Sequence, residues 1–176
     1  METGMKTRIL SLAFALFTAG CVGIPENVKP VSNFKLDKYL GKWHEIARLD
    51  HSFERGLTKV TADYSLREDG GVKVLNRGYS AEDNSWKEAE GRAYFVKAPD
   101  QGFLKVSFFG PFYGSYIVFD LDHGNYQYAL VCGPDKSYLW ILAREPKIKN
   151  DVKDALIKKA AESGFDTGKL IFISQD

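Results

Sequence analysis

The sequence has few of the residues that build metal, disulfide or phosphate sites. It holds two cysteines and three histidines, and the histidines show no spacing typical of a zinc site. No glycine-rich segment leads from a strand into a helix, which is the usual arrangement around a bound phosphate. A nucleophile with a neighbouring base is also missing from the pattern. We therefore expect no metal, no cofactor and no enzymatic activity.

Charge and long apolar runs are also scarce. The formal net charge is +1, whereas a nucleic-acid-binding domain carries a basic stripe, so no nucleic-acid partner is expected. Beyond the first 20 residues no apolar run approaches the roughly 20 residues that a membrane-spanning helix needs. What the chain does have is aromatic residues, at 14% of its length, and these favour β-strands.

The N-terminus has the layout of an export signal. Lys6 and Arg8 form a basic start, an apolar stretch covers 9–17, and two small residues precede Cys21. We predict that residues 1–20 are a signal peptide. Their removal from the 176 residues leaves 156, enough for one domain with its own core.

The small residues that end at Cys21 resemble the lipobox of bacterial lipoproteins, in which the cysteine is acylated and becomes the mature N-terminus. Thr18 stands where that motif usually has Leu, and an ordinary signal with an incidental cysteine is the alternative. The resemblance implies a lipid anchor at Cys21 and a lipidated tether over 21–33. It also implies the bacterial outer membrane, because Val22 stands where an inner-membrane retention signal would place Asp.

We predict one domain over 34–176. From 43 to 144 the chain repeats one pattern, which is a short apolar and aromatic run followed by a turn. Gly, Asn and Asp in these turns tolerate the positive φ of tight hairpins. Eight such runs at short spacing predict an up-and-down antiparallel β-barrel. The runs cover 43–49, 60–66, 72–79, 86–96, 103–109, 113–121, 126–131 and 138–144.

One segment after these runs has helical periodicity instead. Asn150 is a favourable N-cap, and Val152, Leu156 and Ala160 form an apolar stripe at helical spacing. Residues 169–173 can add a short last strand. The predicted fold class is therefore all-β, an eight-stranded antiparallel up-and-down β-barrel with one C-terminal α-helix and a short final strand.

The motifs along these runs resemble those of the lipocalin family. Gly41 and Trp43 form a Gly-x-Trp motif at the head of the first run, Asp120 precedes a later hairpin, and Arg144 ends the eighth run. The segment 106–114 is similar to bacterial members of the family. The resemblance implies that Arg144 covers the Trp43 indole at the closed end of the barrel, as a planar cation stacks on an aromatic face. Without the resemblance, Trp43 is a core residue and Arg144 a surface charge.

A lipocalin barrel has room for one small ligand. The resemblance implies a protein that binds and stores or transports amphiphilic lipids, with lysophospholipids and fatty acids as the candidate ligands. Strand side chains alternate between the two faces, so counting from Trp43 and Arg144 identifies the inward positions. The predicted ligand-binding residues are Glu45, Ala47, Tyr138, Trp140 and Leu142 by this count, and Tyr113 from the aromatic loop.

Two other interpretations remain open at this point. The protein could be a lipid-converting enzyme that uses Cys132 as its nucleophile, because a prostaglandin synthase among the lipocalins works through a cysteine. It could also be an interaction protein, in which the aromatic loop 108–113 pairs two copies of the chain as a homodimer and the cavity is incidental.

Overall fold

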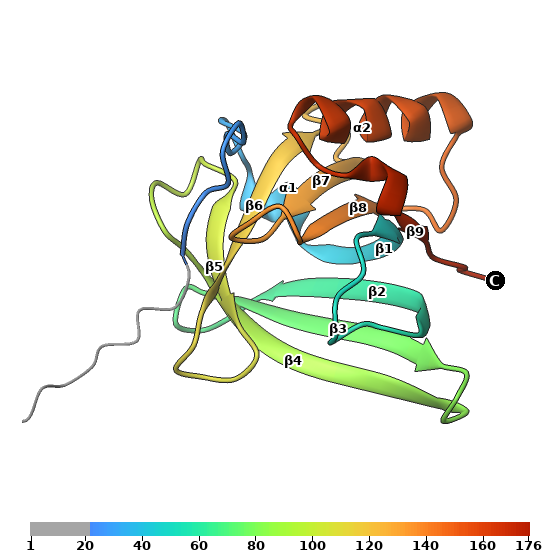
Figure 1. Ribbon diagram of the computed structural model, residues 1–176. Coiled ribbons are helices and arrows are strands. Elements are labelled where there is room, and N and C mark those ends of the chain that lie inside the picture. The colour runs from blue at the N-terminus through green and yellow to red at the C-terminus, as the bar shows by residue number, and fades with distance from the viewer. Residues whose placement is uncertain (1–21) are drawn as a thin grey trace, which may run out of the picture.

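An antiparallel sheet closes on itself in the computed structural model, which describes residues 22–176 (Figure 1). Neighbouring strands follow the order of the chain from β2 to β8, and β1 then pairs with both β8 and β2. The predicted eight-stranded up-and-down barrel is confirmed. Its strands are β1 (Gly41–Arg48), β2 (Leu57–Leu66), β3 (Val72–Ser80), β4 (Ser85–Phe95), β5 (Phe103–Ser107), β6 (Gly114–Leu121), β7 (Tyr128–Cys132) and β8 (Leu139–Ala143).

A short ninth strand, β9 (Ile171–Phe172), pairs with the end of β1 outside the barrel. Strand β2 pairs with β1 only as far as His44, so the later residues of β1 have a free edge that β9 occupies. The predicted final strand over 169–173 is therefore present but shorter, because the 3₁₀-helix η1 (Thr167–Lys169) takes up its beginning.

The helix α2 (Asn150–Glu162) lies against the outside of the barrel (Figure 1). Leu156 and Ala160 are its buried residues, and both belong to a hydrophobic cluster with Ile141 and Cys132 of the barrel wall. A second cluster fills the closed end of the barrel around Trp43. Two cores result, one between helix and barrel and one inside the barrel.

Residues 22–33 have no helix or strand but lie along the barrel wall. The amide of Val31 donates to the carbonyl of Val118, and Val28 is buried in the cluster beneath the helix. Further toward the N-terminus the carbonyl of Gly23 accepts a hydrogen bond from Ser115 Oγ at 2.6 Å. Most of the proposed tether is thus attached to the barrel. The proposed signal peptide and Cys21 lie outside the described residues.

Strand β1 contains a β-bulge that changes which face its residues occupy. Its register against β8 shifts between Glu45, opposite Leu142, and Ala47, opposite Ile141. Ile46 and Ala47 both pack in the cluster beneath α2. An extra residue of this kind reverses the alternation of every later side chain in the strand.

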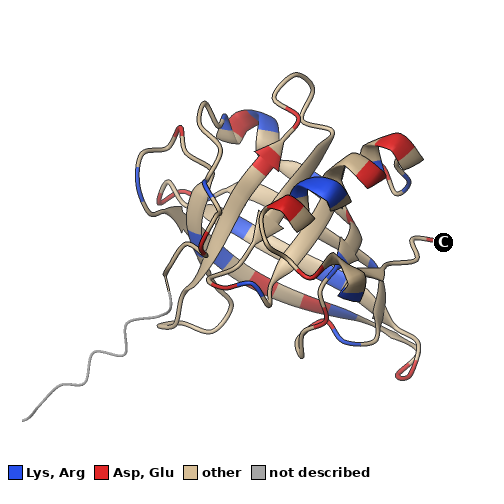
Figure 2. Cartoon of the chain, turned by 45° about the horizontal axis from the view of Figure 1, so that its top comes forward, with Lys and Arg blue, Asp and Glu red and all other residues tan. Residues whose placement is uncertain are grey.

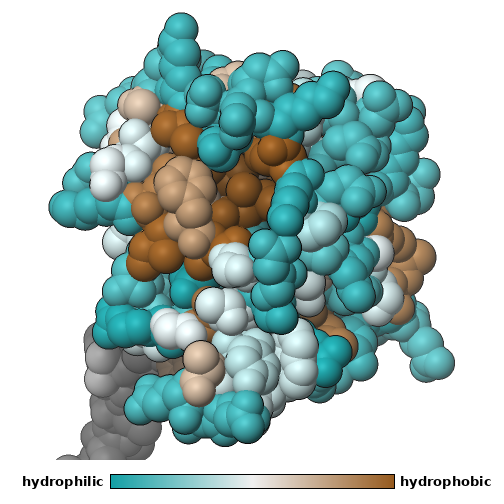
Figure 3. Space-filling view, turned by 90° about the vertical axis from the view of Figure 1, so that its right-hand side faces the viewer, coloured by the Kyte–Doolittle hydropathy of each residue, from teal (hydrophilic) through white to brown (hydrophobic). Residues whose placement is uncertain are grey.

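The outer surface mixes both signs of charge. In Figure 2 basic and acidic residues are interspersed along the helix and the outer strands. Figure 3 shows the side on which β9 lies, where hydrophobic side chains gather in a patch bordered by hydrophilic ones. Ile171 and Phe172 of β9 are both exposed. No helix within residues 22–176 is both long enough and apolar enough to cross a membrane.

Candidate functional site

The barrel encloses a cavity of about 530 Å³ that opens at one end. This volume is within the range of roughly 300–1,000 Å³ that is typical of small-molecule sites. Three loops bound the opening, namely β1–β2 with Phe53, β5–β6 with Phe109 and Phe112, and β7–β8 with Pro134 and Tyr138. Most of the wall is apolar, and its apolar residues include Leu57, Val60, Val74, Val106, Val131 and Leu142.

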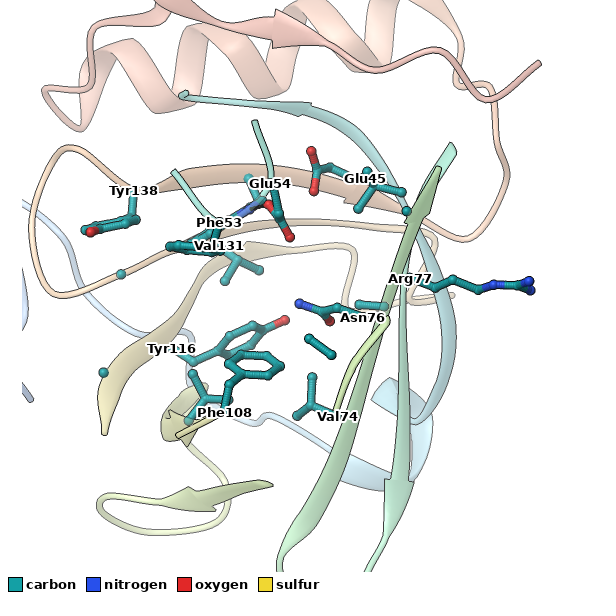
Figure 4. A pocket seen from close by; sticks show the side chains of 18 of the residues that line it. Glu45, Phe53, Glu54, Val74, Asn76, Arg77, Phe108, Tyr116, Val131 and Tyr138 are labelled. Carbon is teal, nitrogen blue, oxygen red and sulfur yellow. Dashed lines mark hydrogen bonds between the residues drawn. The ribbon is translucent and has the colours of Figure 1, made fainter. Parts of the chain in front are cut away.

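Four of the predicted ligand-binding residues line this cavity, namely Glu45, Tyr138, Trp140 and Leu142. Figure 4 shows Glu45 and Tyr138 on the wall among the other lining side chains. The prediction that Ala47 also faces the cavity is wrong. The bulge turns Ala47 to the outer face of β1, where it is fully buried in the cluster beneath α2.

Tyr113 is also absent from the cavity wall. Its hydroxyl accepts a hydrogen bond from Arg92 Nε at 3.0 Å, and its ring lies against Tyr94 and below the Lys105 ammonium. These partners lie on β4 and β5, beside the loop rather than inside the barrel. Alternation along a strand does not apply to loop residues, so the sequence offered no count from which to place this side chain.

The bulge brings Arg48 into the barrel, where it joins a buried polar cluster that the sequence analysis missed. Arg48 Nη1 donates to Glu45 Oε1 at 2.6 Å, and its Nη2 donates to the carbonyl of Glu54 at 2.6 Å. The Glu54 carboxylate lies 3.0 Å from His51 Nε2 and accepts a hydrogen bond from Trp140 Nε1 at 3.0 Å. Regular alternation puts Glu45 and Arg48, three residues apart, on opposite faces of the strand, so the local sequence contains no signal of this cluster.

The two carboxyl groups of this cluster have opposite pKa shifts. Burial and the nearby charge of Glu54 raise the pKa of Glu45 to about 8, against the opposing effect of Arg48. Burial alone would raise the pKa of Glu54 as well, but His51 and the hydrogen bond from Trp140 lower it. Glu54 is therefore the ionised member, and Glu45 holds a proton at neutral pH.

This assignment predicts how stability depends on pH. The native state keeps the Glu45 proton up to about pH 8, whereas the ordinary pKa of the group is 4.5. Between these values the native state binds more protons than the unfolded state, so the contribution of Glu45 lowers the unfolding free energy as pH rises. Glu45→Gln should flatten the decline, as measured by urea denaturation at pH 5, 7 and 9.

The control is Glu90→Gln, which changes an exposed carboxylate paired with Lys73 on the outer surface. It should leave the pH profile of the parent unchanged. An equal decline in the parent and in Glu45→Gln would contradict the assignment of the proton to Glu45.

The deep part of the cavity holds a second set of polar groups. The Tyr116 hydroxyl lies 2.7 Å from the hydroxyls of both Tyr39 and Tyr64, and burial raises the pKa of all three. Nearby on the wall, Asn76 Oδ1 and Ser107 Oγ are buried without a hydrogen-bond partner among the described residues. Figure 4 shows Asn76 and Tyr116 pointing into the same space. These groups can accept or donate hydrogen bonds to a polar part of a ligand.

Arg144 and Trp43 meet at the closed end of the barrel. The guanidinium lies 4.1 Å from the centre of the Trp43 ring, and it donates to the carbonyls of Lys42 and Lys38 at 2.8 and 2.7 Å. Gly41 has φ +89°, a conformation that glycine adopts without strain. Asp120 takes no part in the neighbouring turn. It pairs with Leu130 within the sheet, while the Asp122 carboxylate accepts hydrogen bonds from the turn amides.

We expect Arg144→Ala to lower stability by about 2–4 kcal/mol, because it removes a cation–π contact and three charged hydrogen bonds, to the carbonyls of Lys38, Lys42 and Tyr126. For a domain of this size the melting temperature should fall by roughly 5–15 °C. The matched control is Arg77→Ala, which removes a guanidinium 4.2 Å from the exposed ring of Trp86 and should cost less than about 1 kcal/mol. Loss of ligand binding at an unchanged melting temperature would contradict a structural role for Arg144.

Cys132 is unsuited to act as a nucleophile in this cavity. It is fully buried in the cluster beneath α2, on the far side of the barrel wall from the ligand space. Burial also raises the pKa of its thiol to about 12, so the reactive thiolate is scarce at neutral pH. Within residues 22–176 no three His, Cys, Asp or Glu side chains gather as a metal site would require.

Comparison with solved structures agrees with this architecture. Insecticyanin from the tobacco hornworm Manduca sexta superposes with a TM-score of 0.67 at 26% identity, and 86% of each chain is covered. Lobster apocrustacyanin A1 superposes with a TM-score of 0.63 at 16% identity, covering 87% of this chain and 93% of that one. At that lower identity the likeness concerns the fold alone.

Sequence comparison gives nearer relatives. The outer membrane lipoprotein Blc of Vibrio cholerae is 62% identical over 171 residues, covering 97% of this chain and 99% of its own. The Blc protein of Escherichia coli K12 is 52% identical over 163 residues, covering 93% and 92%. Temperature-induced lipocalin-1 of Arabidopsis thaliana is 33% identical, covering 82% and 81%. Both bacterial relatives are named outer membrane lipoproteins, and at this level of identity the location of this chain is also the bacterial outer membrane. The lipocalin-like domain model matches residues 34–175, and with these relatives it shows that the chain belongs to the lipocalin family.

Proposed function

We propose that the protein binds amphiphilic lipids with a single acyl chain, lysophospholipids or fatty acids, and stores or transports them in its barrel. The observation that carries this proposal is the cavity of about 530 Å³, which is mostly apolar but has polar groups at defined places. Each buried methylene contributes about 0.8 kcal/mol, so an acyl chain can supply most of the affinity. Membership of the lipocalin family supports a small hydrophobic ligand.

The proposed pose puts the acyl chain against the aliphatic wall and the polar end toward the opening. Tyr138 and Trp140 lie on that side, and Trp140 already donates to the Glu54 carboxylate. Tyr113 has no part in this pose, because its hydroxyl is held by Arg92.

A series of ligands that differ only in acyl length tests the proposal. Affinity should rise about fourfold for each added methylene until the chain fills the cavity, and should then level off or fall. Trp140 should report binding through its fluorescence, since it lines the cavity, whereas Trp43 is sealed under Arg144 and Trp86 lies on the surface. An affinity independent of acyl length would contradict binding inside the barrel.

We further propose that Cys21 is acylated and anchors the protein. Alignment with the Vibrio cholerae lipoprotein covers 171 of the 176 residues and so includes this position. Anchoring by a lipoprotein cysteine uses more than one acyl chain, which is needed because a single chain binds a membrane only marginally. Pairing of two copies through the loop 108–113 stays a prediction.

A further inference from the structure

The N-terminal segment ends at the open rim of the barrel. At Val31 it is hydrogen-bonded to Val118 in the middle of β6, and at Gly23 to Ser115 at the start of β6. Strand β6 begins directly after the β5–β6 loop, which bounds the cavity opening. The segment therefore runs along β6 toward the opening, and Gly23 lies beside the rim.

Covalent geometry then limits where an anchor can be. Cys21 is two residues from Gly23, and two extended residues span at most about 7 Å. A lipid on Cys21 must therefore enter the membrane close to the rim. With so short a connection, the barrel cannot turn its opening far from the membrane unless residues 22–31 detach from β6.

The same rim carries most of the exposed large hydrophobic side chains. Nine of these are exposed among the described residues, and five lie on the rim loops or on the end of the N-terminal segment. Among these five, Phe109 is the most exposed at 82%, followed by Phe112 at 59%. Exposed aromatic side chains around one opening are costly in water but suit a membrane interface. The five residues are Val22, Ile24, Phe53, Phe109 and Phe112.

Two cations lie against Tyr113, which follows Phe112 in the chain. Arg92 donates to the Tyr113 hydroxyl, and the Lys105 ammonium lies 5.0 Å from the centre of the same ring. Neither cation belongs to an ion pair within the part of the chain that the structure describes. Lipid phosphates can supply the missing negative charge once the loop reaches the head groups.

We propose that the open rim rests on the membrane that holds the anchor, with Phe109 and Phe112 inserted among the lipids. This rests on the proposed acylation of Cys21. Phe109 and Phe112 also line the cavity, so the opening faces the lipid phase directly. A lipid then passes between leaflet and cavity without crossing bulk water, which removes the largest barrier to its exchange.

The test uses the full acylated protein in vesicles of phosphatidylethanolamine and phosphatidylglycerol whose acyl chains carry bromine, a short-range quencher of tryptophan. Phe109→Trp and Phe112→Trp each add a reporter at the rim. Leu66→Trp adds one at an exposed position near the β2–β3 turn, at the other end of the barrel. The fluorescence added by either rim tryptophan should be quenched by half or more, and that of Leu66→Trp should remain within a tenth of its unquenched value.

Quenching at position 66 equal to that at the rim, or none at the rim, would overturn the proposal. Mass spectrometry of the N-terminal peptide first establishes acylation, so a missing anchor is recognised separately. The quenching measurement does not require a ligand in the cavity. It therefore still tests the contact between rim and membrane if the protein fails to bind lipids in solution. If one rim variant does not fold, the other gives the same answer.

Discussion

Ala62→Trp should reduce the affinity for long-chain lysophospholipids or fatty acids by roughly 200-fold. Ala62 lies on β2 opposite Trp43 and lines the deeper part of the cavity. An indole at this position occupies space that would otherwise hold roughly four methylenes, which corresponds to about 3 kcal/mol of lost burial. The acyl length of highest affinity should also become shorter, because the rigid barrel cannot lengthen to compensate.

The measurement is a titration followed by Trp140 fluorescence or by calorimetry, with ligands of several acyl lengths. Ser65→Trp is the matched control, since it adds the same side chain to the same strand at an exposed position. It should bind as the parent does. If Ala62→Trp binds long chains as tightly as the parent and prefers the same length, the ligand lies outside the barrel, and the interaction-protein interpretation gains support.

The Cys21→Ser variant should lose acylation and membrane attachment completely. The hydroxyl of serine cannot form the thioether that carries the lipid of a lipoprotein, so incorporation of labelled palmitate should fall to background. The protein should move from the membrane fraction to the soluble fraction. Cys132→Ser is the control, because Cys132 is the other cysteine of the chain and is fully buried. Equal labelling of the parent and of Cys21→Ser would show that the anchor is elsewhere or absent.

The sequence predicted the barrel well because its signals are local and repeated. Each hairpin needs its own turn residues and each strand its own apolar run, so one ambiguous segment does not change the order of strands. The C-terminal helix was equally clear from its apolar stripe, whose members Leu156 and Ala160 are buried against the barrel. Arg144 and Trp43 could be paired from the resemblance to lipocalins, since both belong to its recurring motifs.

The residues that line the cavity were harder to predict, because they depend on which residues of each strand face inward. Counting by twos placed Glu45 correctly on the wall and then failed at Ala47, where the bulge inserts a residue. Nothing in the local sequence marks a bulge that depends on pairing with two neighbouring strands. His51 and Glu54 were missed for another reason. They lie in the β1–β2 loop, and only the path of this loop in the folded protein brings them to the cluster.

The single inserted residue in β1 makes the chemistry of the barrel interior depend on residue spacing as well as on residue type. Pairing β1 with β8 in regular register, with Ile46 kept and the bulge lost, would keep every charged group of the chain but move Arg48 to the outer face, among the aliphatic side chains under α2. The Glu45 and Glu54 carboxyl groups would then face each other without their cation. A one-residue gap at Ile46 in an alignment, by contrast, leaves the charge of the interior unchanged, because regular alternation then puts Glu45 and Arg48 on the same face of the strand.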